Sequence, residues 1–380
     1  MDPADIDAKL TGTVYAPNGE IPISGALVYT TTAPVEPIPD GAYCQDCVEL
    51  PPEVHWTLTE PDGSFELPAA SGLARNFVVQ KGQFLRVTSV DIPPGDLIVE
   101  EASSTLPGEW NPDAGEWIPK MAVVFTQIDL IENLLAKVGL GEVDAQGTLV
   151  PGSESFDHLT GEQARALLDD LDAMLKYHII FIPCGGENWA GPKPLSAARI
   201  ENIQKYVAAG GKWYVTDWAN EYVYEPFPAH QTFVDGDFGK DLEAYESPGT
   251  VLDPDMLTWL EALPEDLKDP GDGLPTLFDL PSVRLVDNWS AISETPDIIV
   301  QDDDGNDVNI GHYTWVEAAA GGPPTPNHMT VTANYSCGKM LFSTYHTAEG
   351  GHTGIAPQEL ILVYLILEIG VCQADLEPPE

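Results

Sequence analysis

Two apolar runs, each followed by a tight turn, are the clearest structural signal in the chain. One run covers residues 179–182 and leads into Cys184-Gly-Gly, and the other covers residues 213–215 and leads into Asp217. Strands that are apolar along their whole length are typical of a parallel sheet with helices on both faces. A helical pattern over residues 197–209, stopped by a glycine pair, lies between them. This strand–helix–strand order predicts right-handed βαβ units.

The first quarter of the chain has a different pattern. Apolar and polar residues alternate over residues 10–15 and 26–32, with Asn18-Gly19 between them as a hairpin turn. Further short strands follow, again separated by turn residues, and no helical period is present. This pattern predicts an all-β sandwich over residues 9–103, after an N-terminal extension over residues 1–8.

A proline- and glycine-rich stretch over residues 104–118 is expected to be a linker. The α/β pattern then extends over residues 119–373 and predicts a three-layer domain with a mainly parallel sheet. Residues 222–280 interrupt it with acids and prolines and are interpreted as an insertion, and residues 374–380 form a tail. The expected fold is therefore a β-sandwich followed by an α/β domain.

The charge of the chain limits its partners. Sixty-one acidic residues stand against 16 Lys and Arg, which gives a formal net charge of −45 over 380 residues. Such a polyanion is repelled by nucleic acid and by anionic membrane surfaces. No apolar stretch reaches the roughly 20 residues that a membrane span needs. The acids suit a soluble surface in a salty medium, or the binding of divalent cations.

The cysteines indicate an oxidising compartment. Cys44 and Cys47 form a C-x-x-C pair, Cys337 and Cys372 flank the last strand and helix, and Cys184 is left over. Two disulfides would fit an exported protein. For Cys44 and Cys47 a local disulfide is favoured over a zinc site with His55, because no fourth ligand is evident, and free thiols are a third alternative. We expect a secreted or cell-surface bacterial protein, whose signal sequence this chain does not contain.

Three segments of the β region carry a resemblance to a known family. Leu10-Thr-Gly-Thr-Val14, Ile23-Ser-Gly-Ala-Leu-Val28 and Asp62-Gly-Ser-Phe-Glu-Leu67 follow one another in the order typical of the carboxypeptidase regulatory-like domain. The resemblance implies a prealbumin-like β-sandwich that serves as an adhesive module or a spacer. An insertion over residues 34–54, which contains both cysteines of the C-x-x-C pair, departs from the family pattern.

The second region resembles the class I glutamine amidotransferase-like proteins, which have a flavodoxin-like sheet. The likeness rests on residues 177–186, 206–218 and 338–349. It implies a nucleophilic cysteine at the turn after residues 213–215, with His346 and Glu349 as its partners. Here that turn reads Val215-Thr-Asp-Trp-Ala219, without the cysteine or the flanking glycines that an oxyanion-binding elbow needs.

The missing cysteine makes a non-catalytic protein the leading hypothesis. Such a protein would bind a protein or a glycan at the cell exterior and would require no cofactor. The rival is a hydrolase or metal site formed by Asp217, His346 and Glu349, or one in which Cys184 is the nucleophile. The first hypothesis predicts that Trp218 closes over Asp217, and the second predicts that Asp217 lies beside an open pocket within reach of His346.

A third hypothesis is a subunit of an extracellular assembly that calcium bridges. Gln301-Asp-Asp-Asp-Gly-Asn-Asp307 superficially resembles a calcium-binding loop. Its glycine comes one position early, however, and no glutamate closes the loop. A hairpin turn is the favoured interpretation, with a weak calcium site at Asp302, Asp304 and Asn306 as the alternative.

Overall fold

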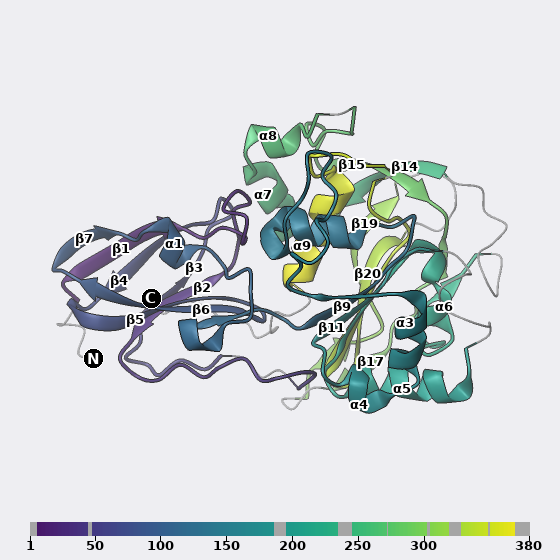
Figure 1. The fold of residues 1–380 in the computed structure, drawn as a ribbon, viewed down its shortest axis with the longest axis horizontal. Helices are drawn as coiled ribbons and strands as arrows, with labels where there is room; N and C mark the ends of the chain where they lie inside the picture. The colour runs from purple at the N-terminus through teal and green to yellow at the C-terminus, as the bar shows by residue number, and fades with distance from the viewer. Residues whose placement is uncertain are drawn as a thin grey trace.

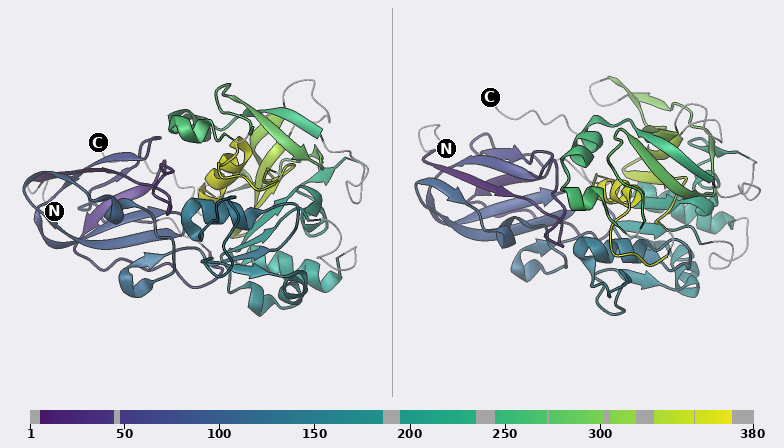
Figure 2. Two further views of the ribbon diagram at one scale, coloured as in Figure 1. Left: turned by 45° about the horizontal axis from the view of Figure 1, so that its top comes forward. Right: turned by 90° about the horizontal axis from the view of Figure 1, so that it is seen from above.

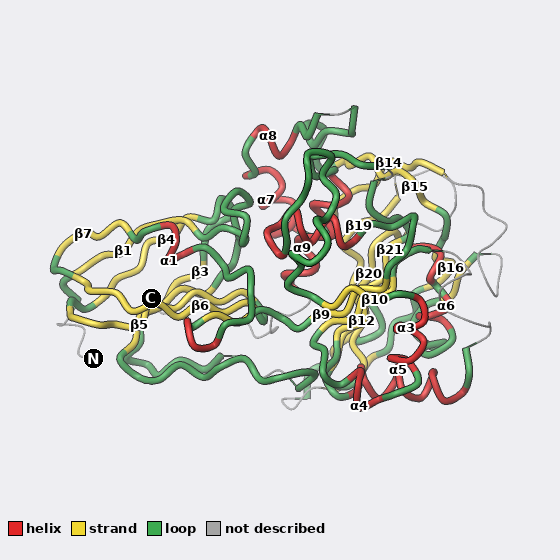
Figure 3. The backbone as a smooth tube through the Cα atoms, viewed as in Figure 1, coloured by secondary structure: helices red, strands yellow, loops and turns green. Residues whose placement is uncertain are grey.

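The computed structural model describes residues 6–44, 48–185, 195–234, 245–271, 273–301, 305–318, 328–348 and 350–368. Within them, residues 8–117 form a lobe built from strands, which we call the β lobe. Residues 121–368 form a second lobe, the α/β lobe, which lies beside the first in every view (Figures 1 and 2). Helices gather almost entirely in the α/β lobe (Figure 3).

The β lobe consists of two sheets packed face to face. The smaller has the order β4-β1-β7, with β4 antiparallel and β7 parallel to β1. The larger is antiparallel and has the order β3-β2-β5-β6-β8. Phe65 of the small sheet packs on Phe77 of the large one, with ring centroids 5.9 Å apart. The strands are β1 (Ala8–Thr13), β2 (Leu27–Thr31), β3 (Trp56–Leu58), β4 (Ser64–Ala69), β5 (Gly72–Lys81), β6 (Phe84–Ile92), β7 (Gly95–Ile98) and β8 (Glu116–Trp117).

Residues 104–118 connect the lobes and have structure of their own. They contain a 3-10 turn, η2 (Pro112–Ala114), and the edge strand β8, which pairs with β6. Leu106 and Ile118 are buried in the same hydrophobic cluster as the β-lobe core. A short helix, α1 (Glu101–Ser104), precedes this segment.

The α/β lobe is organised around a nine-stranded mixed sheet with the order β10-β9-β11-β12-β21-β20-β19-β14-β15. The first five strands are parallel, and in chain order they run second, first, third, fourth and fifth, which is the flavodoxin-like arrangement. The other four are antiparallel. Their bounds are β9 (Met121–Val124), β10 (Asp157–Leu159), β11 (Ile179–Ile182), β12 (Lys212–Thr216), β14 (Tyr245–Val251), β15 (Ser282–Asn288), β19 (Tyr313–Ala318), β20 (His328–Tyr335) and β21 (Gly338–Ser343).

The expectation of a mainly parallel sheet is therefore wrong, because half of the strand pairs are antiparallel. β20 and β21 form an antiparallel hairpin. That hairpin, however, extends the parallel sheet instead of forming a separate unit. The segment over residues 222–280 contributes β14, which lies between β19 and β15 in the same sheet.

Helices cover both faces of the parallel half, because alternate residues of each strand enter different cores. Met121 and Val123 of β9 join one hydrophobic cluster, and Ala122 and Val124 join the other. The first cluster also contains apolar residues of α2 (Ile131–Leu135) and α9 (Pro357–Glu368); the second contains residues of α3 (Gly161–Leu168) and α5 (Ala197–Ala208). The remaining elements are η3 (Ala136–Leu140), α4 (Leu171–Met174), η4 (Asp217–Ala219), α6 (Glu221–Tyr224), α7 (Pro254–Ala262), α8 (Glu265–Lys268), β13 (Thr232–Phe233), β16 (Ile292–Glu294), β17 (Ile299–Gln301) and β18 (Asp307–Asn309).

The two lobes share one continuous hydrophobic cluster, which includes Leu10 of β1 and Ile366 of α9. Hydrogen bonds reinforce the contact: the Trp259 indole donates to the carbonyl of Pro22 at 2.8 Å, and the Asn18 amide donates to the carbonyl of Lys137 at 3.0 Å. Because burial of apolar area is the main stabilising term in such a contact, we expect the lobes to move as one body.

A loop of the β lobe, residues 34–44, crosses to the amino end of the parallel sheet. The amide of Ala42 donates to the carbonyl of Leu175 at 2.9 Å, and Asp40 pairs with Lys120 at 2.5 Å. The loop ends in a disulfide between Cys44 and Cys337, which follows β20. We call residues 34–44 the strap.

The disulfide corrects two expectations from the sequence. Cys44 does not pair with Cys47, and it is not a thiolate that could bind zinc with His55, because its sulfur is bonded to Cys337. The partners are 293 residues apart, so local spacing gave no information about the pairing. Cys47 and Cys372 lie outside the described residues. Among the helices of the described ranges, none is long and apolar enough to cross a membrane.

The disulfide predicts a measurable loss of stability when it is removed. The double substitution Cys44→Ser and Cys337→Ser should lower the free energy of unfolding by about 2–4 kcal/mol, because a very long loop is no longer closed in the unfolded chain. Denaturant unfolding with and without a thiol reductant measures this loss. The control Cys47→Ser should unfold like the parent, and a non-reduced peptide map that joins Cys44 to Cys47 would contradict the assignment.

Candidate functional site

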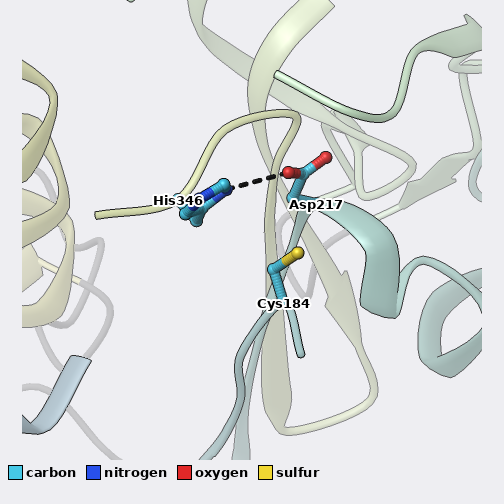
Figure 4. Close-up of side chains that lie close together, drawn as sticks. All are labelled: Cys184, Asp217 and His346. Atoms are coloured by element: carbon cyan, nitrogen blue, oxygen red, sulfur yellow. Dashed lines mark hydrogen bonds and ion pairs between the residues drawn. The ribbon is translucent and has the colours of Figure 1, made fainter. Parts of the chain in front are cut away.

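Four loops meet at the carboxyl end of the parallel sheet, where ligand sites form in folds of this kind. They follow β9, β11, β12 and β21 and present Asp129, Cys184, Asp217 and His346. Figure 4 shows Cys184, Asp217 and His346 close together, each from a different segment. All four side chains are at most 1% exposed. The sequence hypotheses placed Asp217 with His346 and Glu349, or made Cys184 the nucleophile; the structure brings Asp217, His346 and Cys184 together.

Asp217 occupies a strained turn directly after β12. Its φ is +47°, a left-handed value that is uncommon for any residue except glycine. Turns of this kind display the nucleophile in enzymes with a strand–elbow–helix motif. Here one carboxylate oxygen, Oδ2, lies 2.9 Å from Nδ1 of His346, and the other accepts the backbone N–H of Trp289 at 2.9 Å. Two neighbouring segments therefore hold the carboxylate in place.

Asp217 and His346 form a buried ion pair at neutral pH. Burial raises the pKa of Asp217 to about 6, although its hydrogen bond with His346 lowers the value in part. Burial alone would lower the pKa of His346, but the hydrogen bond to Asp217 and the charges of Asp217 and Asp129 raise it to about 9. The imidazole is thus positively charged and the carboxylate negatively charged at pH 7.

Cys184 is a free thiol beside this pair. Burial raises its pKa well above the usual value, and the negative charges of Asp217 and Asp129 act in the same direction. Since the thiolate is the nucleophilic form of cysteine, this environment does not activate Cys184. Its backbone N–H donates to the hydroxyl of Thr216 at 2.8 Å, which fixes the loop after β11 against the end of β12.

A second buried carboxylate, Asp129, ties the loops together and was not identified from the sequence. Its Oδ1 accepts hydrogen bonds from the backbone N–H of Thr347 at 3.1 Å and from the Thr347 hydroxyl at 2.8 Å, and its Oδ2 accepts the hydroxyl of Thr216. Asp129 therefore links Thr216, which directly precedes Asp217, to Thr347, which directly follows His346. Its place after the first parallel strand, equivalent to the place of Asp217 after β12, was a signal that could have identified it.

Two tryptophans lie next to Asp217, from the turn after β12 and from the loop after β15. The rings of Trp218 and Trp289 are 4.9 Å apart between centroids and tilted by 53°. Both indole N–H groups are buried without a hydrogen-bond partner among the described residues. Three cavities lined by described residues lie away from this pair, at residues 30–75, at 246–284 and between the lobes. Asp217 is thus within hydrogen-bonding reach of His346, and its side chain is 0% exposed.

A further polar cluster fixes the segment that carries His346. His352 Nε2 lies 3.2 Å from Oε1 of Glu359, at the start of α9, and His352 Nδ1 lies 3.0 Å from the ammonium of Lys137. Glu359 also accepts the backbone N–H groups of Ala348 and Ala356. Glu349, the expected partner of His346, lies outside the described residues. Glu359 was missed because a helical glutamate among apolar residues has no distinctive spacing.

The remaining predicted ligands do not form a site in the described residues. Asp302 and Asp304 lie outside them, and Asn306 lies in the turn between β17 and β18. Those strands pair antiparallel, with Gln301 opposite Asp307, as the hairpin interpretation predicts. His55 precedes β3. Cys44 cannot bind zinc together with it as a thiolate, because that cysteine is in a disulfide.

The comparisons with known proteins give only distant likenesses. No protein family matches the sequence, and no curated protein matches it. A cytoplasmic protein of Salmonella typhimurium covers 66% of this chain and 99% of its own length, with 12% identity and a TM-score of 0.37. A protein described as ThuA-like from Parabacteroides merdae covers 68% and 92%, with 12% identity and a TM-score of 0.36. A β-galactosidase from Bacillus circulans covers 66% of this chain but only 30% of its own, with 10% identity and a TM-score of 0.35. At these scores the likenesses do not bear on function, and the resemblance of the β lobe to the carboxypeptidase regulatory-like domain stays a prediction.

The raised pKa values predict that stability falls as the pH rises. Folded His346 titrates near pH 9 instead of 6.5, so its stabilising contribution is complete below pH 6.5 and is lost as the pH rises through 9. Asp217 is also raised, from 3.8 to about 6, and therefore acts in the same direction over a lower range.

The substitution Asp217→Asn should lower the free energy of unfolding by about 3 kcal/mol at pH 7, because it removes one partner of a buried pair. It should also flatten the pH dependence between pH 6.5 and 9. Chemical denaturation across this range measures both effects. Asp297→Asn, at an exposed neighbour of His312, is the control and should change neither; an unchanged pH profile in Asp217→Asn would show that the pair does not stabilise the fold.

Proposed function

We propose that this chain is a non-catalytic binding or structural protein of the cell exterior. The observation that supports this most strongly is the state of Asp217. It has the position and the backbone strain of a nucleophile, yet it is 0% exposed and both its oxygens accept hydrogen bonds. A nucleophile or a general base must come within hydrogen-bond distance of its substrate. Asp217 instead stabilises the loops at the carboxyl edge of the sheet.

The disulfide supports a location outside the cytoplasm, because such bonds form and persist in oxidising compartments. The strongly acidic composition is compatible with an extracellular medium of high ionic strength, where salt screens the repulsion between surface charges. We further infer that the two lobes correspond to two domains. The β lobe would then be an adhesive module that the strap and the disulfide hold in a fixed orientation.

A groove on the α/β lobe is the place where we expect a partner to bind. It has a volume of about 590 Å³, within the usual range for ligand sites, and it is lined by β14, β15 and residues 274–279. Arg284 and Glu246 form an exposed ion pair on its wall. Phe278 is not itself a lining residue, but it directly precedes Asp279, which is, and its side chain is 60% exposed. An exposed aromatic ring beside polar groups suits a glycan, which offers both apolar ring faces and hydroxyl groups.

Substitution at Asp217 separates the proposal from the hydrolase alternative. In an enzyme, replacing the catalytic carboxylate abolishes turnover and leaves stability unchanged or higher, because active sites are strained. Here we expect Asp217→Asn to unfold at a lower temperature, and both proteins to be inactive on ester, amide and glycoside substrates. The control Asp279→Asn should retain the parent stability. Turnover by the parent that Asp217→Asn loses would overturn the proposal.

The groove gives a binding prediction of its own. If a glycan stacks on Phe278, then Phe278→Ala should weaken binding to a soluble oligosaccharide panel about tenfold, which corresponds to about 1.4 kcal/mol. Saturation-transfer NMR and calorimetry measure this change. Phe125→Ala, at another exposed phenylalanine, is the matched control and should bind like the parent. Equal binding by both variants would exclude Phe278 as the contact.

A further inference from the structure

The geometry points to a zinc site formed by Cys184, Asp217 and His346. This inference does not depend on the proposed function, since a structural ion would serve a binding protein and a metal centre would serve an enzyme. Each residue offers one ligand atom, and the three atoms lie within 4.8 Å of one another. In the described part of the chain this is the cluster of histidine, cysteine and acidic side chains that could surround a single ion.

The backbone positions these ligands before any ion binds. Cys184, Asp217 and His346 follow β11, β12 and β21, which are neighbours in the sheet. Zinc binds sulfur at about 2.3 Å and nitrogen or oxygen at about 2.0–2.2 Å, so its ligand atoms are roughly 3.3–3.6 Å apart. The Asp217 and His346 atoms are 2.9 Å apart, and the sulfur lies within 4.8 Å. Side-chain shifts of about 1 Å therefore suffice to form three metal–ligand bonds.

The ligand set selects among metals. A thiolate, an imidazole and a carboxylate are the ligands that zinc uses, whereas calcium and magnesium require a shell of oxygens. Three protein ligands leave a fourth position for a solvent molecule. The described residues do not form an oxygen-rich shell at this edge, because the carboxylate of Asp129 already accepts three hydrogen bonds.

The charge balance also favours a divalent ion with one thiolate. Without metal, the Asp217 carboxylate and the His346 imidazolium sum to zero, and the Cys184 thiol is neutral. Zinc replaces one proton on the imidazole and one on the thiol, so that carboxylate, thiolate, neutral imidazole and Zn²⁺ again sum to zero. The exchange releases two protons and places no net charge in the buried site, which avoids a large desolvation cost.

The state of His346 gives an independent reason to expect an ion. Its Nε2 is buried and has no hydrogen-bond partner among the described residues. In the imidazolium form that nitrogen carries an unpaired N–H of a charged group, which is costly to bury. Zinc at Nδ1 makes the ring neutral; the Nε2 N–H stays unpaired, but it no longer belongs to a charged group, which lowers the cost. Neighbouring hydrogen bonds from Trp289 to Asp217, and from Thr347 to Asp129, would hold the ligands in place around the ion.

The test uses the full chain with Cys47→Ser and Cys372→Ser, which leaves the Cys44–Cys337 disulfide and the Cys184 thiol as the cysteine sulfurs. The chain is unfolded with chelator, refolded with zinc or cobalt, and dialysed. We expect about one metal per chain and a thiolate-to-cobalt charge-transfer band, with protons released on binding, because zinc takes cysteine as the thiolate and histidine as the neutral imidazole.

Matched variants assign the ligands. Cys184→Ser should remove the charge-transfer band and weaken zinc binding at least tenfold, while the far-ultraviolet spectrum shows that the fold is kept. His346→Gln should weaken zinc binding similarly, and His312→Gln, at a half-buried histidine outside the cluster, should bind like the parent. A refolded parent without bound zinc, or a Cys184→Ser chain that keeps both the metal and its midpoint of thermal unfolding, would overturn the site. Neither result depends on whether the protein has an activity.

Discussion

The buried ion pair between Asp217 and His346 is the interaction on which the α/β lobe depends. Removing two charged groups from water is expensive, and only close pairing with further hydrogen bonds offsets that cost. The structure provides both, through the 2.9 Å contact and the backbone N–H of Trp289. Because the partners follow β12 and β21, which are neighbours in the sheet, the pair fixes the junction between the parallel strands and the antiparallel hairpin that extends them. Strain at Asp217, with its φ of +47°, persists because this network determines the turn.

Other buried carboxylates also hold neighbouring segments together by accepting hydrogen bonds. Asp129 joins the loops after β9, β12 and β21, and Glu359 joins α9 to the segment that carries His346. At the opposite edge of the sheet, the strap and the disulfide attach the β lobe. Both edges of the parallel sheet are therefore restrained, one by buried charges and the other by a covalent bond. These restraints limit the motion of the two lobes relative to one another.

Much of this architecture could be predicted from local sequence patterns. The unbroken apolar run at residues 179–182 corresponds to β11, and the glycine pair after residue 209 ends α5 as expected. Asp217, Cys184 and His346 could be brought together because strand ends in a parallel sheet share an edge. The mixed character of the sheet could not be predicted, since β14 and β15 alternate like ordinary two-faced strands and their partners are distant in sequence. The disulfide was missed for a similar reason, because Cys44 and Cys337 come together only through the packing of the lobes.

The most direct test of the central claim is the ionisation of His346 itself. In a protein labelled with nitrogen-15 at histidine, the imidazole nitrogens can be followed by NMR across the pH range, with His346→Gln to assign the signal. A closed, structural ion pair predicts an imidazolium that keeps its proton through neutral pH and titrates near pH 9, with slow proton exchange. A ring that titrates near its ordinary value and exchanges its proton rapidly with solvent would show an open site, and would contradict a non-catalytic role for Asp217.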